Sequence, residues 1–145
     1  MKNESTIRNS IFEILKIKSD KAKFDYINHK IKTSVDFKIK LGEVNFLFEI
    51  DSNNVAKTIF GQYLLLNKVE NLPENAFLII IHCYKDYNIN RTNIHLDYAK
   101  EVYKCFIPYI TFTKDDWIKL IENKSKVQLE KLLISLYKKT TCTQN

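Results

Sequence analysis

The chain has 145 residues, which is enough for one domain with a buried core, and we treat residues 1–145 as that single domain. Apolar residues make up 45% of the chain and charged residues 28%, which excludes a disordered polyelectrolyte and is typical of a soluble globular protein. The 23 Lys and Arg residues against 17 Asp and Glu residues give a formal net charge of +6, a modest excess that favours contact with polyanions but does not prove it.

The N-terminal sequence MKNESTIRNS lacks the apolar core of a signal peptide, and no run approaches the roughly 18 apolar residues of a membrane helix. Cys83, Cys105 and Cys142 are far apart and form no close pair, which favours reduced thiols. We therefore expect a cytoplasmic protein that does not contact a membrane.

The first half of the chain predicts a helix followed by a hairpin. Residues 5–18 carry apolar residues at helical spacing, and a short strand is predicted near KFDYIN, residues 23–28. Residues 35–41, VDFKIKL, alternate between apolar and polar side chains, so they predict a strand with Asp36, Lys38 and Lys40 on one face. After a turn at residues 42–43, residues 44–50 return as a second strand that is apolar on both faces until Glu49, which indicates a central position.

The second half predicts helices that alternate with strands. A helix over residues 52–69 has Ser52 to Asn54 as candidate caps, and Thr113 is a candidate cap for a helix over residues 114–123. The remaining predicted elements are a strand at 76–84, a helix around 95–104, a strand at 106–112 and a last helix at 126–139.

This order predicts an α/β fold with a mixed central sheet flanked by helices. The later strands should be parallel because helices connect them. We place the core at about residues 5–112 and the C-terminal helices at about 113–139.

Two acids one residue apart, Glu49 and Asp51, end the predicted central strand, and Asp36 lies near the start of the strand before it. The order of these acids and of Gln62 in the following helix resembles the PD-(D/E)xK nuclease superfamily, which has the restriction-endonuclease-like fold. The segments that carry the resemblance are VD (35–36), FEID (48–51) and GQYLLL (61–66).

The resemblance implies a Mg²⁺-dependent DNA endonuclease in restriction, repair or mobile-element biology, which would also accept Mn²⁺. Mg²⁺ takes oxygen ligands and few protein carboxylates, and Asp36 and Glu49 would supply that pair. The backbone carbonyl of Ile50 would be a further ligand, and Gln62 would orient the site. A homodimer is expected, because one small domain cuts one strand at a time.

One position departs from the family pattern, because Asp51 stands where the family has a lysine two residues after the Glu. A lysine elsewhere could take over its role, and the candidates are Lys38, Lys40 and Lys57. Alternatively, Asp51 is an additional metal ligand. In the third interpretation the domain is catalytically inactive and binds nucleic acid or a protein partner.

Each candidate also has an ordinary structural interpretation. Asp36 on a polar strand face is as easily a solvated residue, and Asp51 as easily a cap for the following helix. Gln62 could equally be a hydrogen-bonded core amide. Glu49 is the strongest candidate, because an unpaired carboxylate at the end of a buried strand is costly.

Overall fold

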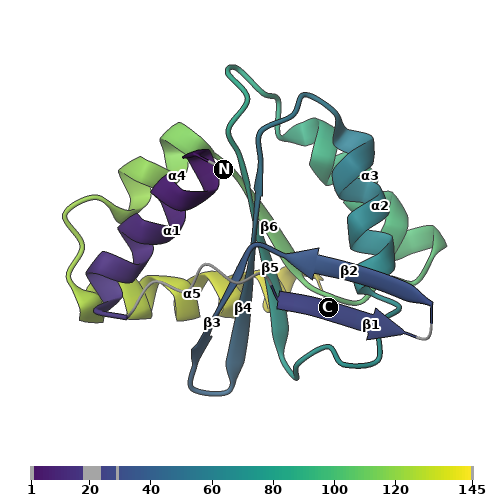
Figure 1. Cartoon of the computed structure of the whole chain (residues 1–145), viewed down its shortest axis with the longest axis horizontal. Coiled ribbons are helices and arrows are strands. Elements are labelled where there is room, and N and C mark those ends of the chain that lie inside the picture. Colours follow the sequence, from purple (N-terminus) through teal and green to yellow (C-terminus); the bar gives the residue numbers. More distant parts are fainter. Residues whose placement is uncertain (1, 18–23, 29, 145) are drawn as a thin grey trace.

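The computed structural model describes residues 2–17, 24–28 and 30–144 and shows a mixed four-stranded sheet flanked by helices (Figure 1). The strands of this sheet are β3 (Phe37–Leu41), β4 (Val44–Asp51), β5 (Ala76–His82) and β6 (Tyr109–Thr113), in the spatial order β3-β4-β5-β6. β3 is antiparallel to β4, whereas β4, β5 and β6 are parallel. The predicted hairpin, the central position of β4 and the parallel later strands are therefore confirmed.

Helices cover both faces of the sheet (Figure 1). The helices are α1 (Lys2–Leu15), α2 (Ala56–Leu66), α3 (Asn90–Val102), α4 (Lys114–Ile121) and α5 (Lys126–Gln144). α1, α4 and α5 pack on one face, and α2 and α3 pack on the other. A separate antiparallel hairpin of β1 (Phe24–Asn28) and β2 (Ile31–Val35) precedes β3 and lies on the side of α2 and α3.

The central strands are apolar on both faces because helices cover both faces. On β4, Phe46 and Phe48 belong to the core beneath α1, α4 and α5, whereas Leu47 belongs to the core beneath α2 and α3. Trp117 of α4 packs edge-on against Phe48, with ring centroids 5.9 Å apart. Each such fully buried side chain contributes roughly 1.5–3 kcal/mol to folding, so β4 is firmly anchored.

Residues 35–41 do not form the single strand that their alternation predicts. β2 ends at Val35 and β3 begins at Phe37, with Asp36 between them. Val35 packs into the core beneath α2 and α3, whereas Phe37 packs into the opposite core, so the two side chains do not share a face. The chain changes direction at Asp36 as it leaves the β1–β2 hairpin and enters the central sheet.

The predicted caps of α2 are also wrong, because α2 begins at Ala56 and its N-cap, Val55, makes no side-chain cap bond. Ser52 instead accepts a hydrogen bond from the side chain of Asn3 (3.0 Å), and Asn54 accepts one from Arg91 (2.6 Å). By contrast, Thr113 caps α4 as predicted, since its hydroxyl accepts from the N–H of Asp116 (3.1 Å).

Within the described residues, no helix combines the length and the apolar character that crossing a membrane requires.

Candidate functional site

Asp36 and Glu49 come together at the carboxyl end of β4. The β3–β4 register ends with Phe37 opposite Phe48, and Asp36 and Glu49 are the next residues of the two segments beyond that pair. The N–H of Asp36 donates to the carbonyl of Phe48 (3.0 Å), so Asp36 and Phe37 both lie against Phe48 and the regular ladder ends there. The side chains of Asp36 and Glu49 both line one small pocket at this end of β4, so the two carboxylates are neighbours there.

A pocket of about 180 Å³ opens at these carboxylates, and we call it the β4 pocket. Asp36 is only 5% exposed, and its Oδ2 accepts a hydrogen bond from the N–H of Ile50 (2.8 Å). This bond holds the Asp36 side chain against the end of β4. The candidates that line the β4 pocket are Asp36, Glu49, Ile50, Asp51 and Gln62.

Gln62 of α2 connects the helix to the strand that carries Asp36. Its Nε2 donates to the carbonyl oxygen of Ser34 (2.7 Å), two residues before Asp36. Gln62 also lines the β4 pocket, so its side chain both lines the pocket and fixes the chain that enters β3. That Gln62 orients the site stays a prediction.

Asp51 lies in a different environment from Glu49, although the two are two residues apart. Its Oδ2 is 3.2 Å from Nδ1 of His82, the residue opposite it on β5. Its Oδ1 accepts from the N–H of Asn53 (3.3 Å). Both carboxylate oxygens of Asp51 therefore take part in internal hydrogen bonds.

The contacts of His82 extend this network away from the β4 pocket. Nε2 of His82 lies 2.9 Å from the hydroxyl of Thr92, which lies 2.8 Å from the hydroxyl of Tyr87. The rings of His82 and Tyr87 stack with centroids 4.0 Å apart. Asp51, His82 and Thr92 thus tie the ends of β4 and β5 to α3, and all three side chains are buried.

The three candidate lysines differ in their place relative to the carboxylates. Lys38 is opposite Leu47, which is two residues before Glu49 on the same face of β4. Lys40 is two residues beyond Lys38 and is exposed, and Lys57 is exposed on α2 and does not line the β4 pocket. At about 3.3 Å per residue, Lys38 is roughly 7 Å along the strand from Asp36, whereas Lys40 is roughly 13 Å away.

Two residues at the site were missed by sequence reasoning. Glu4 lines the β4 pocket and pairs with the buried Arg8 (3.3 Å), but the first helix was expected to begin only at residue 5. His82 was given no role. The sequence did contain a signal for His82, because His82 is the polar last residue of an otherwise apolar strand. Asp51 is the last residue of the neighbouring strand β4.

The oxygen donors that line the β4 pocket fit a hard cation, which prefers oxygen ligands. Among the described residues, no group of three or more His, Cys, Asp and Glu side chains is arranged to hold a metal. Two neighbouring carboxylates and a backbone carbonyl nevertheless match Mg²⁺, which usually takes only one or two protein carboxylates and keeps waters for the rest.

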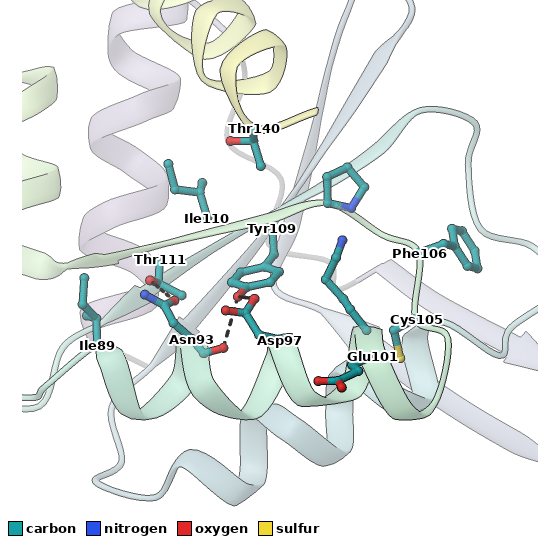
Figure 2. Close-up of a pocket in the computed structure, with 12 residues that line it drawn as sticks. Ile89, Asn93, Asp97, Glu101, Cys105, Phe106, Tyr109, Ile110, Thr111 and Thr140 are labelled. Atoms are coloured by element: carbon teal, nitrogen blue, oxygen red, sulfur yellow. Dashed lines mark hydrogen bonds between the residues drawn. The ribbon is translucent and has the colours of Figure 1, made fainter. Parts of the chain in front are cut away.

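A larger cavity of about 930 Å³ lies between α3 and β6, and we call it the β6 groove (Figure 2). Asn93 and Asp97 of α3 point to the strand, where Asp97 accepts a hydrogen bond from the Tyr109 hydroxyl and Asn93 accepts one from Thr111 (2.6 Å). Burial raises the pKa of Tyr109 above its ordinary value, and the Asp97 carboxylate raises it further. Burial lowers the pKa of Lys100 in the same groove.

Comparison of the chain with protein-family models, with curated proteins and with solved structures finds no match.

Proposed function

We propose that the chain is a Mg²⁺-dependent DNA endonuclease of the PD-(D/E)xK type, with a restriction-endonuclease-like core. The observation that carries this proposal is the presence of Asp36 and Glu49 in one small pocket at the end of a central strand. The element order also supports it, since α1, the β3–β4 hairpin, α2 and the parallel strand β5 follow one another as the resemblance implies.

Asp36, Glu49 and the backbone carbonyl of Ile50 would hold the divalent cation. A bound Mg²⁺ ion offsets charge on the scissile phosphate and lowers the pKa of a bound water. The N–H of Ile50 keeps one Asp36 oxygen in place, and Gln62 fixes the chain before Asp36. The protein therefore holds the two carboxylates in position before the substrate binds, so these side chains need no reorganisation during the reaction.

Lys38 is the lysine that we assign to the missing motif position. It lies opposite Leu47, on the face of β4 that carries Glu49, and its side chain is long enough to span the roughly 7 Å from its own strand position to that of Asp36. Its ammonium group would stabilise negative charge on the phosphate in the transition state. None of the three lysines lines the β4 pocket itself, but Lys40 is further along β3 and Lys57 is exposed on α2.

Asp51 is assigned a positioning role and not a ligand role. Its oxygens bond His82 and the N–H of Asn53, so it fixes the turn after β4 and the spacing of β4 and β5. Asp51 would thus align the end of β4 that carries Glu49 and Ile50.

Incubation of supercoiled plasmid with the purified protein tests the proposal. We expect nicked or linear product with Mg²⁺ or Mn²⁺, no product with EDTA, and no product from Glu49→Gln, which keeps the shape of the side chain but removes its charge. Cleavage by Glu49→Gln at the wild-type rate would contradict the assigned site.

A second candidate is a catalytically inactive module that binds nucleic acid or a protein partner. The observation that favours it is the occupation of the motif-lysine position by Asp51, which His82 holds in place. Calorimetric titration with Mn²⁺ separates the two candidates. Binding that Glu49→Gln abolishes supports the nuclease, whereas no heat of binding near neutral pH supports the inactive module.

A further inference from the structure

A cluster of aromatic rings lies where α2 and α3 pack side by side (Figure 1). The ring of Phe60 on α2 has its centroid 5.7 Å from that of His95 and 6.5 Å from that of Tyr98, both on α3. Tyr103, directly after α3, lies 6.3 Å from Phe60 and 6.1 Å from Tyr98 by the same measure. The four rings therefore form one connected group.

This group is open to solvent, unlike the aromatic rings of the core. Tyr98 is 51% exposed and Tyr103 48%, and Ile94 and Val102 of α3 are 68% and 48% exposed. Ile94, Tyr98 and Val102 are four residues apart, so they form one stripe on α3. A contiguous exposed apolar area of this kind marks an interaction site. We call it the α2–α3 surface, and it consists of Phe60, Ile94, His95, Tyr98, Val102 and Tyr103.

A cation lies at each end of the stripe on α3. Arg91, at the start of α3, donates a hydrogen bond to Oδ1 of Asn54 (2.6 Å). Lys104, just after α3, donates one to the carbonyl of Glu101 (3.0 Å). Both cations are exposed, and each of these bonds uses only one of several N–H donors of the side chain. Arg91 and Lys104 are therefore positioned to bind anionic groups of a ligand.

The carboxylates of α3 belong to a different side of the helix. Asp97 and Glu101, the two acidic residues of α3, line the β6 groove, and Asp97 is bonded there to the hydroxyl of Tyr109. α2 contains no acidic residue. The α2–α3 surface therefore combines aromatic rings with positive charge.

We propose that the α2–α3 surface binds single-stranded nucleic acid, with bases stacked on Tyr98 and Tyr103 and phosphates at Arg91 and Lys104. Aromatic rings that stack bases, together with cations that track the backbone, are the usual means of binding single strands. Unpaired bases are required because a duplex covers their faces. A second copy of the chain fits less well, since it would bring the same two cations to the surface without carboxylates to pair with them.

The α2–α3 surface adjoins the β4 pocket. α2 contributes Gln62 to the pocket and Phe60 to the surface, and Asn54, the partner of Arg91, follows Asn53 of the pocket wall. In a step that rests on the proposed function, the substrate class is therefore DNA with an unpaired stretch, held beside the metal site. Binding to the surface itself involves no metal, so it can be measured without cleavage.

Fluorescence anisotropy in EDTA tests the proposal with a labelled oligothymidylate of about 12 nucleotides, a length within the range of single-strand sites. Tyr98→Ala should raise the dissociation constant by about 10-fold, whereas Tyr98→Phe keeps the ring and should match the wild type. Tyr84→Ala is the matched control, because Tyr84 is also 48% exposed but lines a separate pocket with Lys119 of α4. An oligouridylate of the same length, measured in parallel, shows whether DNA or RNA binds more tightly.

The salt dependence of binding tests the two cations. Arg91→Gln and Lys104→Ala should each reduce the slope of log K against log salt by about 0.7, because each variant loses one phosphate contact. Lys126→Ala removes an exposed charge at the start of α5, on the opposite face of the sheet, and should leave the slope unchanged. Equal slopes in all three variants would contradict the assigned phosphate contacts.

No binding by the wild type, equal affinity for a duplex of the same length, or unchanged affinity in Tyr98→Ala would overturn the proposal. A dimer that Tyr98→Ala dissociates without loss of oligonucleotide binding would assign the surface to a second copy and overturn it too. If Tyr98→Ala does not fold, ultraviolet crosslinking of the wild type to a bromodeoxyuridine oligonucleotide decides the matter. Labelling of Tyr98 or Tyr103 supports the proposal, and labelling only elsewhere contradicts it.

The two proposals fail separately in these experiments. A protein that binds the oligonucleotide but never cleaves plasmid would contradict the nuclease and support the α2–α3 surface. A protein that cleaves plasmid but does not bind the oligonucleotide would do the reverse.

Discussion

The β4 pocket and the β6 groove both contain carboxylates, but the two regions hold them differently. In the small β4 pocket, Asp36 and Glu49 lie together at the end of β4. In the much larger β6 groove, Asp97 is bonded to the hydroxyl of Tyr109 and lies beside a strand, not at its end. We therefore assign the divalent cation to the smaller pocket, because neighbouring carboxylates and not volume define such a site.

The largest expected effect is a loss of DNA cleavage that a substitution in the β4 pocket causes and the same substitution in the β6 groove does not. Asp36→Asn should lower plasmid cleavage by about 1000-fold, because a lost carboxylate ligand removes several kcal/mol of transition-state stabilisation. Asp97→Asn, the same substitution in the β6 groove, should leave cleavage unchanged. Rates measured with both variants at the same Mg²⁺ concentration check this, and equal losses would show that the two regions are not functionally distinct.

Asp51→Ala should lower the free energy of unfolding by about 3 kcal/mol, because it leaves the buried His82 without its carboxylate partner. Asp51→Asn keeps a hydrogen-bonding group at the same position and should cost roughly 1 kcal/mol. Urea denaturation at neutral pH measures both values. If the two variants were equally stable, the contact between Asp51 and His82 would not be what fixes the ends of β4 and β5.

Lys38→Ala should reduce cleavage by about 100-fold and leave Mn²⁺ binding intact, since one charge-stabilising group is worth roughly 3 kcal/mol in the transition state. Lys40→Ala and Lys57→Ala remove the same charge at exposed positions and serve as matched controls. A loss confined to Lys40→Ala or Lys57→Ala would move the assisting lysine to that position.

The smallest effect concerns the tyrosines of the core beneath α2 and α3. Burial raises the pKa of Tyr63 and Tyr109 above the ordinary value, so the unfolded chain loses these protons first as pH rises. The folded state should therefore lose stability above about pH 10, by roughly 1.4 kcal/mol per pH unit for each such tyrosine. Urea denaturation between pH 9 and pH 11 measures the slope, and Tyr109→Phe should reduce it; an unchanged slope would contradict the role of this hydroxyl.

Much of the sheet could be predicted from the sequence because hydrophobic patterning reports burial. Residues 44–50 are apolar on both faces, which correctly indicated a central strand. The apolar run at residues 76–84 correctly indicated a strand that helices cover on both faces, and in the structure this strand ends at His82. The break at Asp36 could not be predicted in this way. Apolar and polar residues keep alternating in the sequence from Val35 to Phe37, although Val35 packs into one core and Phe37 into the other. β2 was missed for a related reason, since IKTSV has little apolar character.

The carboxylate pair was predictable, but its surroundings were not. The proximity of Asp36 and Glu49 follows from the β3–β4 hairpin, which is a local feature of the chain. The partner of Asp51 is His82, 31 residues away, and depends on the parallel pairing of β4 and β5. Such pairing leaves no short-range signal, so sequence reasoning left open whether Asp51 was a ligand, a cap or a structural residue.

Crystals grown with Mn²⁺ give the most direct test of the carboxylate site. The account predicts one anomalous difference peak in the β4 pocket, between Asp36 and Glu49 and next to the carbonyl of Ile50, and its loss in Glu49→Gln. No peak in the β4 pocket at saturating Mn²⁺, or a peak in the β6 groove instead, would contradict it.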